Sequence, residues 1–294
     1  MGAKSNKNKR AFTIWELLFL IFIIFLLFGL LMPSLSKVRS RSTEIICKST
    51  LRFYGNAGNS FLKDNDDYFP DPNEWLYTSS SISDVHPIGC RWHDKEFADT
   101  IIKEKKEYQG PVWKYFEAKN YWCCPIFYNI GRLRGCENTE HNSNIEIDPQ
   151  YSYTMNAYLG GSQKGSVQKS NEVRDPTKVF FFAEENSWTL RPDHPKYKAD
   201  WLTSPLSTKA LDNTSLFISA TSEAVDCFAT YHRPGYDLNQ GYGNVVFIDG
   251  HVDSVNAMDQ LRKTKYTSRS KLGRTGNLLW AWPSTTPPAG GLDE

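Results

Sequence analysis

The sequence lacks an excess of charge of either sign, because 34 Lys and Arg residues are matched by 33 Asp and Glu residues. This balance argues against a nucleic-acid coat protein and against an acidic, disordered chain. The chain also lacks a Gly-x-Ser-x-Gly nucleophile motif and a paired Cys-x-x-Cys framework. We therefore predict that the protein is not an enzyme and that it carries no cofactor.

One segment stands out from a chain whose mean hydropathy is only -0.51. Residues 12–32 are almost entirely apolar, and as a helix they would measure about 31 Å, enough to cross a bilayer. Residues 1–11 before them are polar and basic. A cleaved secretory signal is the alternative, with Ser34-Leu35-Ser36 as its cutting site, although its apolar region is usually about 7–15 residues.

Glu16 is the only ionisable side chain between Arg10 and Lys37. An acid at the centre of a membrane helix costs about 2.5–3.5 kcal/mol, although near the end of the span it would reach the lipid headgroups. If the chain is cut between Ala11 and Phe12, the new α-amine lies one helical turn before Glu16. That amine, or the amine of a neighbouring subunit, would pair with the carboxylate and make Glu16 an assembly residue.

The run RAFTIWELL at residues 10–18 resembles the prepilin-type cleavage and methylation motif of type IV pilins and type II secretion pseudopilins. The resemblance implies that a prepilin peptidase cuts between Ala11 and Phe12 and methylates the new amine, and that Glu16 serves assembly. Pro33 falls where many of these proteins have a helix-kinking proline. The family usually has Gly at the position of Ala11.

The resemblance also implies a location and a set of partners. It places the chain in the bacterial inner membrane as a single-pass protein, with the N-terminus in the cytoplasm and the rest outside, in a periplasmic or surface filament. Basic residues lie on both sides of the span, so charge alone does not set this orientation. The expected partners are the prepilin peptidase, other pseudopilin subunits, the secretion or pilus assembly machinery and membrane lipid, without nucleic acid.

The remaining residues predict a stem and a head. Apolar or small residues recur every three or four positions after Pro33, which indicates an amphipathic helix: Leu35, Val38, Ser42, Ile45, Ser49, Phe53 and Ala57. The predicted parts are a leader (1–11), a transmembrane helix (12–33), an amphipathic stem helix (34–66) and a globular head (67–294) with an irregular C-terminal tail.

Short apolar runs in the head predict strands. They include residues 151–158, residues 178–184 and two runs joined at Asp249-Gly250, a dipeptide typical of hairpins. No comparably clear helical pattern alternates with them. We therefore predict an α+β fold, in which the long N-terminal helix, transmembrane in its first half and amphipathic in its second, packs on a mainly antiparallel β-sheet.

The resemblance extends to a large-headed branch of pseudopilin-like proteins. Its landmarks here are the run CKSTL at 47–51, Cys124-Pro125, residues 175–184, and His232 followed by the run NVVFIDGHV at 244–252, which contains the branch's closing F-x-D-G-H-V signature.

His232, Asp249, His251 and Asp253 are candidate metal ligands, because imidazoles and carboxylates suit zinc. A plainer explanation of these residues is that Asp249 forms the turn, while His251 and Asp253 lie on the polar face of a half-buried strand.

The cysteines of the predicted head are candidates for disulfide bonds, which persist outside the cytoplasm: Cys90, Cys123, Cys124, Cys136 and Cys227. Cys47 lies on the stem. The connectivity stays open, although geometry disfavours a bond between the adjacent Cys123 and Cys124.

Two functions fit these features. The leading hypothesis is a pseudopilin-like structural subunit, processed by a prepilin peptidase and assembled into, or tethered at, a type II secretion or type IV pilus-like filament. The rival is a membrane-anchored extracellular binding module for a carbohydrate or protein ligand, which does not polymerise. Most of the Trp and Tyr residues of the head would lie in its core, and a minority would supply the contact surface of such a module. A third hypothesis is an anchored hydrolase that uses His232, Asp249 and His251, but the chain lacks a nucleophile motif to accompany them.

Overall fold

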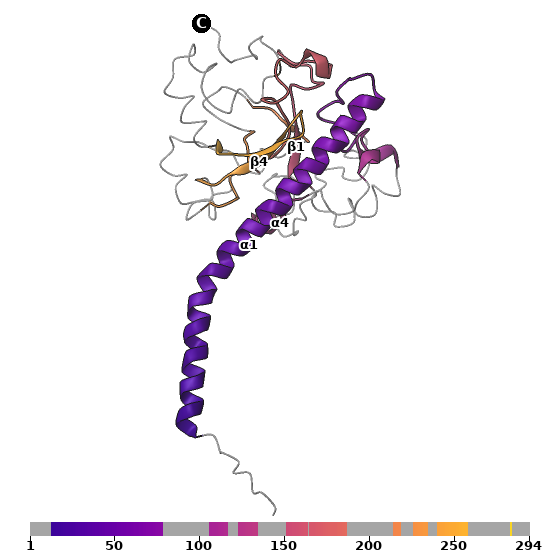
Figure 1. Ribbon diagram of the computed structural model, residues 1–294. Coiled ribbons are helices and arrows are strands. Elements are labelled where there is room, and N and C mark those ends of the chain that lie inside the picture. The colour runs from indigo at the N-terminus through magenta and orange to yellow at the C-terminus, as the bar shows by residue number, and fades with distance from the viewer. Residues whose placement is uncertain are drawn as a thin grey trace, which may run out of the picture. The chain divides into compact units, whose positions relative to one another are not determined.

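The computed structural model describes residues 13–78, 106–116, 123–134, 151–163, 165–186, 214–218, 226–234, 240–257 and 283. The chain divides into two compact units, Met1–Thr43 and Glu44–Glu294. Helix α1 (Ile14–Asp64) contributes its first part to one unit and its second part to the other (Figure 1). The predicted leader and the predicted cleavage site at Ala11 and Phe12 lie outside the described residues.

The first unit contains the apolar part of α1. Ile14–Met32 has a mean hydropathy of 2.8 and no buried residue, and it is the one candidate membrane span in the described part of the chain. A membrane anchor and a signal sequence both have these properties. The helix continues through Pro33 to Asp64, and the predicted kink at Pro33 stays a prediction.

The second part of α1 is amphipathic, but its buried face differs from the predicted one. Cys47, Leu51 and Tyr54 are fully buried, whereas Ile45 is 67% exposed. The face predicted through Ile45 and Ser49 is therefore wrong at these positions, because a second row of apolar residues, offset by two positions, packs into the core instead. Helix α1 ends at Asp64, and Asp66 and Asp67 follow with positive φ angles of 52° and 64°.

The second unit is built on a five-stranded mixed sheet with the order β3-β1-β2-β4-β5. Its strands are β1 (Tyr153–Asn156), β2 (Phe180–Glu184), β3 (Ser215–Leu216), β4 (Gly243–Phe247) and β5 (Val252–Val255). Strands β1 and β3 are parallel, and the other neighbouring pairs are antiparallel. Every residue of β1, β2 and β4 is buried. Burial on both faces explains why β2 is apolar up to Glu184. An apolar helix and a mixed sheet together make an α+β fold.

The hairpin predicted at Asp249-Gly250 is confirmed. Strands β4 and β5 pair in antiparallel register, with Val246 opposite Val252, and Gly250 adopts a φ of +91° in the turn. A positive φ of this kind is readily adopted by glycine, which has no Cβ to clash.

The described part of the second unit also contains a helix that the sequence analysis missed. Helix α4 (Pro125–Arg134) begins at a proline, and proline is favoured at the first helical position because its missing N–H has no partner there anyway. The helix directs the preceding Cys124 into the core, where it is fully buried.

The core lies where the second part of α1 meets the sheet. The ring of Tyr54 lies 5.1 Å from that of Tyr153 on β1 and 5.7 Å from that of Phe182 on β2. Glycines allow this close approach: a Cβ on Gly55 would lie 2.7 Å from Cγ2 of Val246. Helix and sheet thus share one hydrophobic core in the second unit.

We expect Gly58→Ala to lower the free energy of unfolding by about 1–3 kcal/mol, the usual cost of overpacking. The new Cβ would lie 2.6 Å from Cζ of Phe181 and 2.9 Å from Cε2 of Phe182. Urea denaturation of the detergent-solubilised chain, followed by near-ultraviolet circular dichroism, measures the change. The control is Asn56→Ala at an exposed position of the same helix, and equal stability of both variants would contradict the tight contact.

Candidate metal centre

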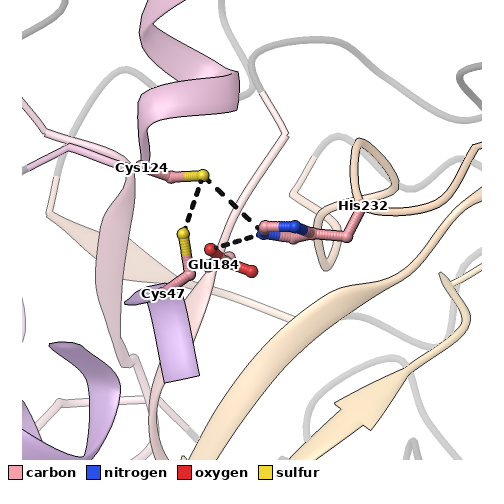
Figure 2. Close-up of side chains that lie close together, drawn as sticks. All are labelled: Cys47, Cys124, Glu184 and His232. Atoms are coloured by element: carbon pink, nitrogen blue, oxygen red, sulfur yellow. Dashed lines mark hydrogen bonds and ion pairs between the residues drawn. The ribbon is translucent and has the colours of Figure 1, made fainter. Parts of the chain in front are cut away.

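Four side chains that can ligate a metal converge in the second unit: Cys47, Cys124, Glu184 and His232 (Figure 2). Sγ of Cys124 lies 3.1 Å from Sγ of Cys47 and 3.6 Å from Nε2 of His232. The same Nε2 lies 2.9 Å from Oε1 of Glu184. All four ligand atoms lie within 4.8 Å of one another, and all four residues are fully buried. We call these residues the four-residue cluster.

Each member comes from a different part of the fold. Cys47 lies on the buried face of α1, and Glu184 is the last residue of β2. Cys124 precedes α4, where its carbonyl accepts a hydrogen bond from the backbone N–H of Tyr128 at 2.8 Å. His232 exchanges two backbone hydrogen bonds with Tyr242, of 3.0 and 2.7 Å. Regular backbone structure therefore holds all four side chains in place.

Hydrogen bonds from outside the cluster orient its members. Oε2 of Glu184 accepts from the backbone N–H of Asn244 at 2.8 Å and from its side-chain amide at 2.9 Å. Oδ1 of Asn244 in turn accepts from the hydroxyl of Ser254 at 3.0 Å. The backbone N–H of Cys124 donates to Oγ of Ser152 at 2.8 Å. These bonds leave Oε1 of Glu184 facing His232.

The electrostatics of the cluster favour a charged imidazole when no metal is bound. Burial lowers the pKa of His232, but attraction by the Glu184 carboxylate and hydrogen bonds to Cys47 and Glu184 outweigh it and raise the pKa to about 10. Burial raises the pKa of the Cys124 thiol well above its usual range, and the hydrogen bond from Cys47 adds to this. Nδ1 of His232 is buried without a hydrogen-bond partner among the described residues.

A second contact near the cluster also joins α1 to the segment that carries His232. Oε2 of the buried Glu44 lies 3.0 Å from Nε of Arg233. Glu44 also lies 3.4 Å from Nζ of Lys48, one turn further along α1. Arg233 adopts a positive φ of 50°, so the backbone turns immediately after His232.

The structure separates the metal ligands that the sequence suggested. His232 belongs to the four-residue cluster, whereas Asp249, His251 and Asp253 are exposed on the β4–β5 hairpin. Oδ1 of Asp249 lies 2.6 Å from Nδ1 of His251, whose ring stacks on Phe247. Asp249 therefore contacts His251 within the hairpin, and the described residues do not group these three side chains with His232.

The candidate disulfide cysteines have different surroundings. Cys124 belongs to the cluster, Cys227 is buried, and Cys123 is half-buried with its thiol 3.7 Å from the carbonyl oxygen of Cys124. Cys90 and Cys136 lie outside the described residues. Cys47 and Cys124 are free thiols in this structure, and disulfide formation by the head cysteines stays a prediction.

The structure gives Glu16 a local role that the sequence analysis missed. Its Oε2 accepts hydrogen bonds from the backbone N–H and the hydroxyl of Thr13, at 2.8 and 2.9 Å. Oγ1 of Thr13 in turn accepts from the backbone N–H of Glu16 at 3.3 Å. This reciprocal pair is a capping box, which satisfies two of the backbone donors left free at the start of a helix. The pattern Thr-x-x-Glu before an apolar run is its sequence signal.

Cys47, Cys124 and Glu184 were also missed as a group. Cys124 and His232 are 108 residues apart, and Glu184 and His232 are 48 apart, so no short spacing motif joins them. A weak signal was available, because each residue lies in one of the landmarks that carry the family resemblance. Glu184 is also an acid at the end of a strand that is otherwise fully apolar.

We expect Glu184→Ala to lower the free energy of unfolding by about 3–5 kcal/mol, because it leaves the buried His232 without its charged partner. Asp253→Ala, which removes an exposed carboxylate from the neighbouring hairpin, should change it by no more than about 0.5 kcal/mol. Thermal melts of the two purified variants measure the difference. Similar losses in both would mean that the hairpin, rather than the cluster, holds the structure together.

No family model matches the chain, and no curated protein or solved structure matches it. Its function must therefore be inferred from its own residues, chiefly the apolar helix with Glu16 and the four-residue cluster.

Proposed function

We propose that the protein is a pseudopilin-like structural subunit, anchored in a bacterial inner membrane by α1 and assembled through this helix into a short filament. The observation that carries the proposal is the helix Ile14–Met32, which is apolar and unburied and contains one acid, Glu16, near its start. An apolar span whose described side chains are unburied is suited to lipid or to the same helix of another subunit.

The prepilin-like motif supports the same function. It places the cut between Ala11 and Phe12, so that a free amine is created immediately before the helix. In the uncut chain Glu16 is engaged by Thr13, and after the cut the amine of a neighbouring subunit would compete for the same carboxylate. The low dielectric of the membrane strengthens such a pair.

The second unit would then form the head outside the membrane. Residues 44–64 of α1 share its hydrophobic core with the mainly antiparallel sheet, so each subunit would carry its head directly on the helix that assembles. Prepilin peptidase, other pseudopilins and the secretion or pilus machinery are the partners that this arrangement requires. In this proposal the head has a structural role without catalysis.

We expect the mature chain in bacterial membranes to begin at Phe12 and to carry a methylated amine. Co-expression with a prepilin peptidase, followed by mass spectrometry of the N-terminal peptide, tests this. Phe12→Asp is a suitable control, because a charge at the first mature position should disturb processing while leaving the span intact. A chain that begins after Ser36, or one that keeps its leader when the peptidase is present, would contradict the proposal.

Two substitutions separate the assembly role of Glu16 from its capping role. Glu16→Gln removes the charge but keeps a side chain that serves in a capping box, whereas Thr13→Ala removes the capping hydroxyl and keeps the charge. We expect Glu16→Gln to reduce a crosslinked ladder of subunits by an order of magnitude or more, and Thr13→Ala to preserve it. The measurement is crosslinking in intact membranes, with membrane insertion checked in parallel.

The same experiment addresses the rival function. A ladder that is unchanged by Glu16→Gln would show that the charge is not needed for assembly. The absence of any ladder from the processed wild-type chain would favour an anchored binding module that acts as a monomer.

A further inference from the structure

We propose that Cys47, Cys124, Glu184 and His232 form a structural zinc site that fastens helix α1 to the sheet. This site is independent of whether the chain assembles into a filament. It is also distinct from the set His232, Asp249, His251 and Asp253 that the sequence suggested, with which it shares only the histidine.

The donor atoms have the chemistry that zinc prefers. Two sulfurs, one imidazole nitrogen and one carboxylate oxygen converge from Cys47, Cys124, His232 and Glu184. Structural zinc sites have four protein ligands, mostly thiolates and imidazoles, with carboxylates also used. Hard cations such as Mg²⁺ and Ca²⁺ favour all-oxygen sites, so the two sulfurs exclude them as the preferred occupant.

The distances also suit a tetrahedral ion. Bond lengths of about 2.3 Å to sulfur and about 2.0–2.2 Å to nitrogen and oxygen place tetrahedral ligand atoms roughly 3.3–3.8 Å apart. The close pairs are separated by 3.1 Å between the two sulfurs, 3.6 Å between Sγ of Cys124 and Nε2 of His232, and 2.9 Å between that nitrogen and Glu184. Side-chain shifts of about 1 Å or less would bring all four atoms to bonding distance.

The surroundings fix the ligands as an outer shell does in a metal site. Asn244 holds Oε2 of Glu184 with two hydrogen bonds, which directs Oε1 toward the centre of the cluster. Ser254 in turn orients Asn244. Outer contacts of this kind fix the geometry of ligands and contribute to metal affinity.

A disulfide between Cys47 and Cys124 is the main alternative, but it accounts for only half of the cluster. It would leave Glu184 and His232 buried beside the sulfurs. Burying an ion pair carries a desolvation cost, which the Coulomb attraction between the two charges does not always offset. A divalent cation uses all four side chains at once. It also offsets two of the three negative charges carried by the carboxylate and the two thiolates that it binds.

The full burial of all four ligands assigns the site to the structural class. A catalytic zinc keeps one position open for water or substrate, whereas a structural zinc is closed by four protein ligands. The ligands come from α1, from the residue before α4, from the end of β2 and from the segment that contains His232. One ion would therefore link four segments that are distant in the sequence and would hold Cys47 of the helix against the head.

The test is the metal content of the full chain, purified in detergent without chelators. Elemental analysis should find about one zinc per chain. Zinc content should fall to less than about a tenth in Cys124→Ser and stay unchanged in Cys123→Ser. Cys123 is the matched control, because it is the adjacent cysteine and lies outside the cluster.

A second measurement covers the case in which Cys124→Ser does not fold. Replacement of the metal in the wild-type chain by Co²⁺ should give the visible bands of tetrahedral cobalt and a thiolate charge-transfer band in the near ultraviolet. Removal of the metal with a chelator should also lower the melting temperature of the wild-type protein. The proposal is overturned if the folded wild-type chain binds neither Zn²⁺ nor Co²⁺, if its peptide map shows Cys47 bonded to Cys124, or if Cys123→Ser loses zinc as fully as Cys124→Ser.

Discussion

The second unit depends on one packing constraint, the burial of a single face of α1 against the sheet. Tyr54 contacts rings from β1 and β2, and Gly55 and Gly58 let the helix backbone approach β4 and β2 closely. Because Cys47 lies on this same face, two turns before Tyr54, the packing of the helix also decides where its thiol points. Hydrophobic burial of this kind supplies most of the stability of a helix in a protein.

The four-residue cluster includes two residues of that core, Cys47 and Cys124, and its burial carries a cost in free energy. Glu184 and His232 are fully buried ionisable groups, and their removal from water is unfavourable unless each finds partners. Asn244 and the mutual contact of the pair supply them in part. The fold places the two buried thiols of Cys47 and Cys124 beside this pair. Other buried polar side chains, such as Asn156 and Thr214, lie elsewhere in the core and donate hydrogen bonds to backbone carbonyls.

Local patterns made much of the fold predictable, while the cluster depended on distant contacts. The apolar span, the strands around residues 153–156 and 180–184, and the hairpin at Asp249-Gly250 all follow from periodicity or turn chemistry. Periodicity identified the buried face of the stem only in part, since Ala57 is buried and Ile45 is exposed. Helix α1 carries two apolar rows, and only tertiary packing chooses between them. His232 was grouped with Asp249 and His251 because imidazoles and carboxylates suit zinc, whereas its actual partners in the cluster are 48 or more residues away.

The distance in sequence between α1 and the strands that cover it has a consequence for folding. Asn59 of α1 donates a hydrogen bond to the carbonyl of Ile248, 189 residues further along the chain. Gly55 likewise contacts Val246 on β4. Because synthesis proceeds from the N-terminus, the apolar face of α1 stays exposed until most of the remaining residues have been made. Such a high contact order predicts slow folding, with a long interval in which the helix needs protection from aggregation.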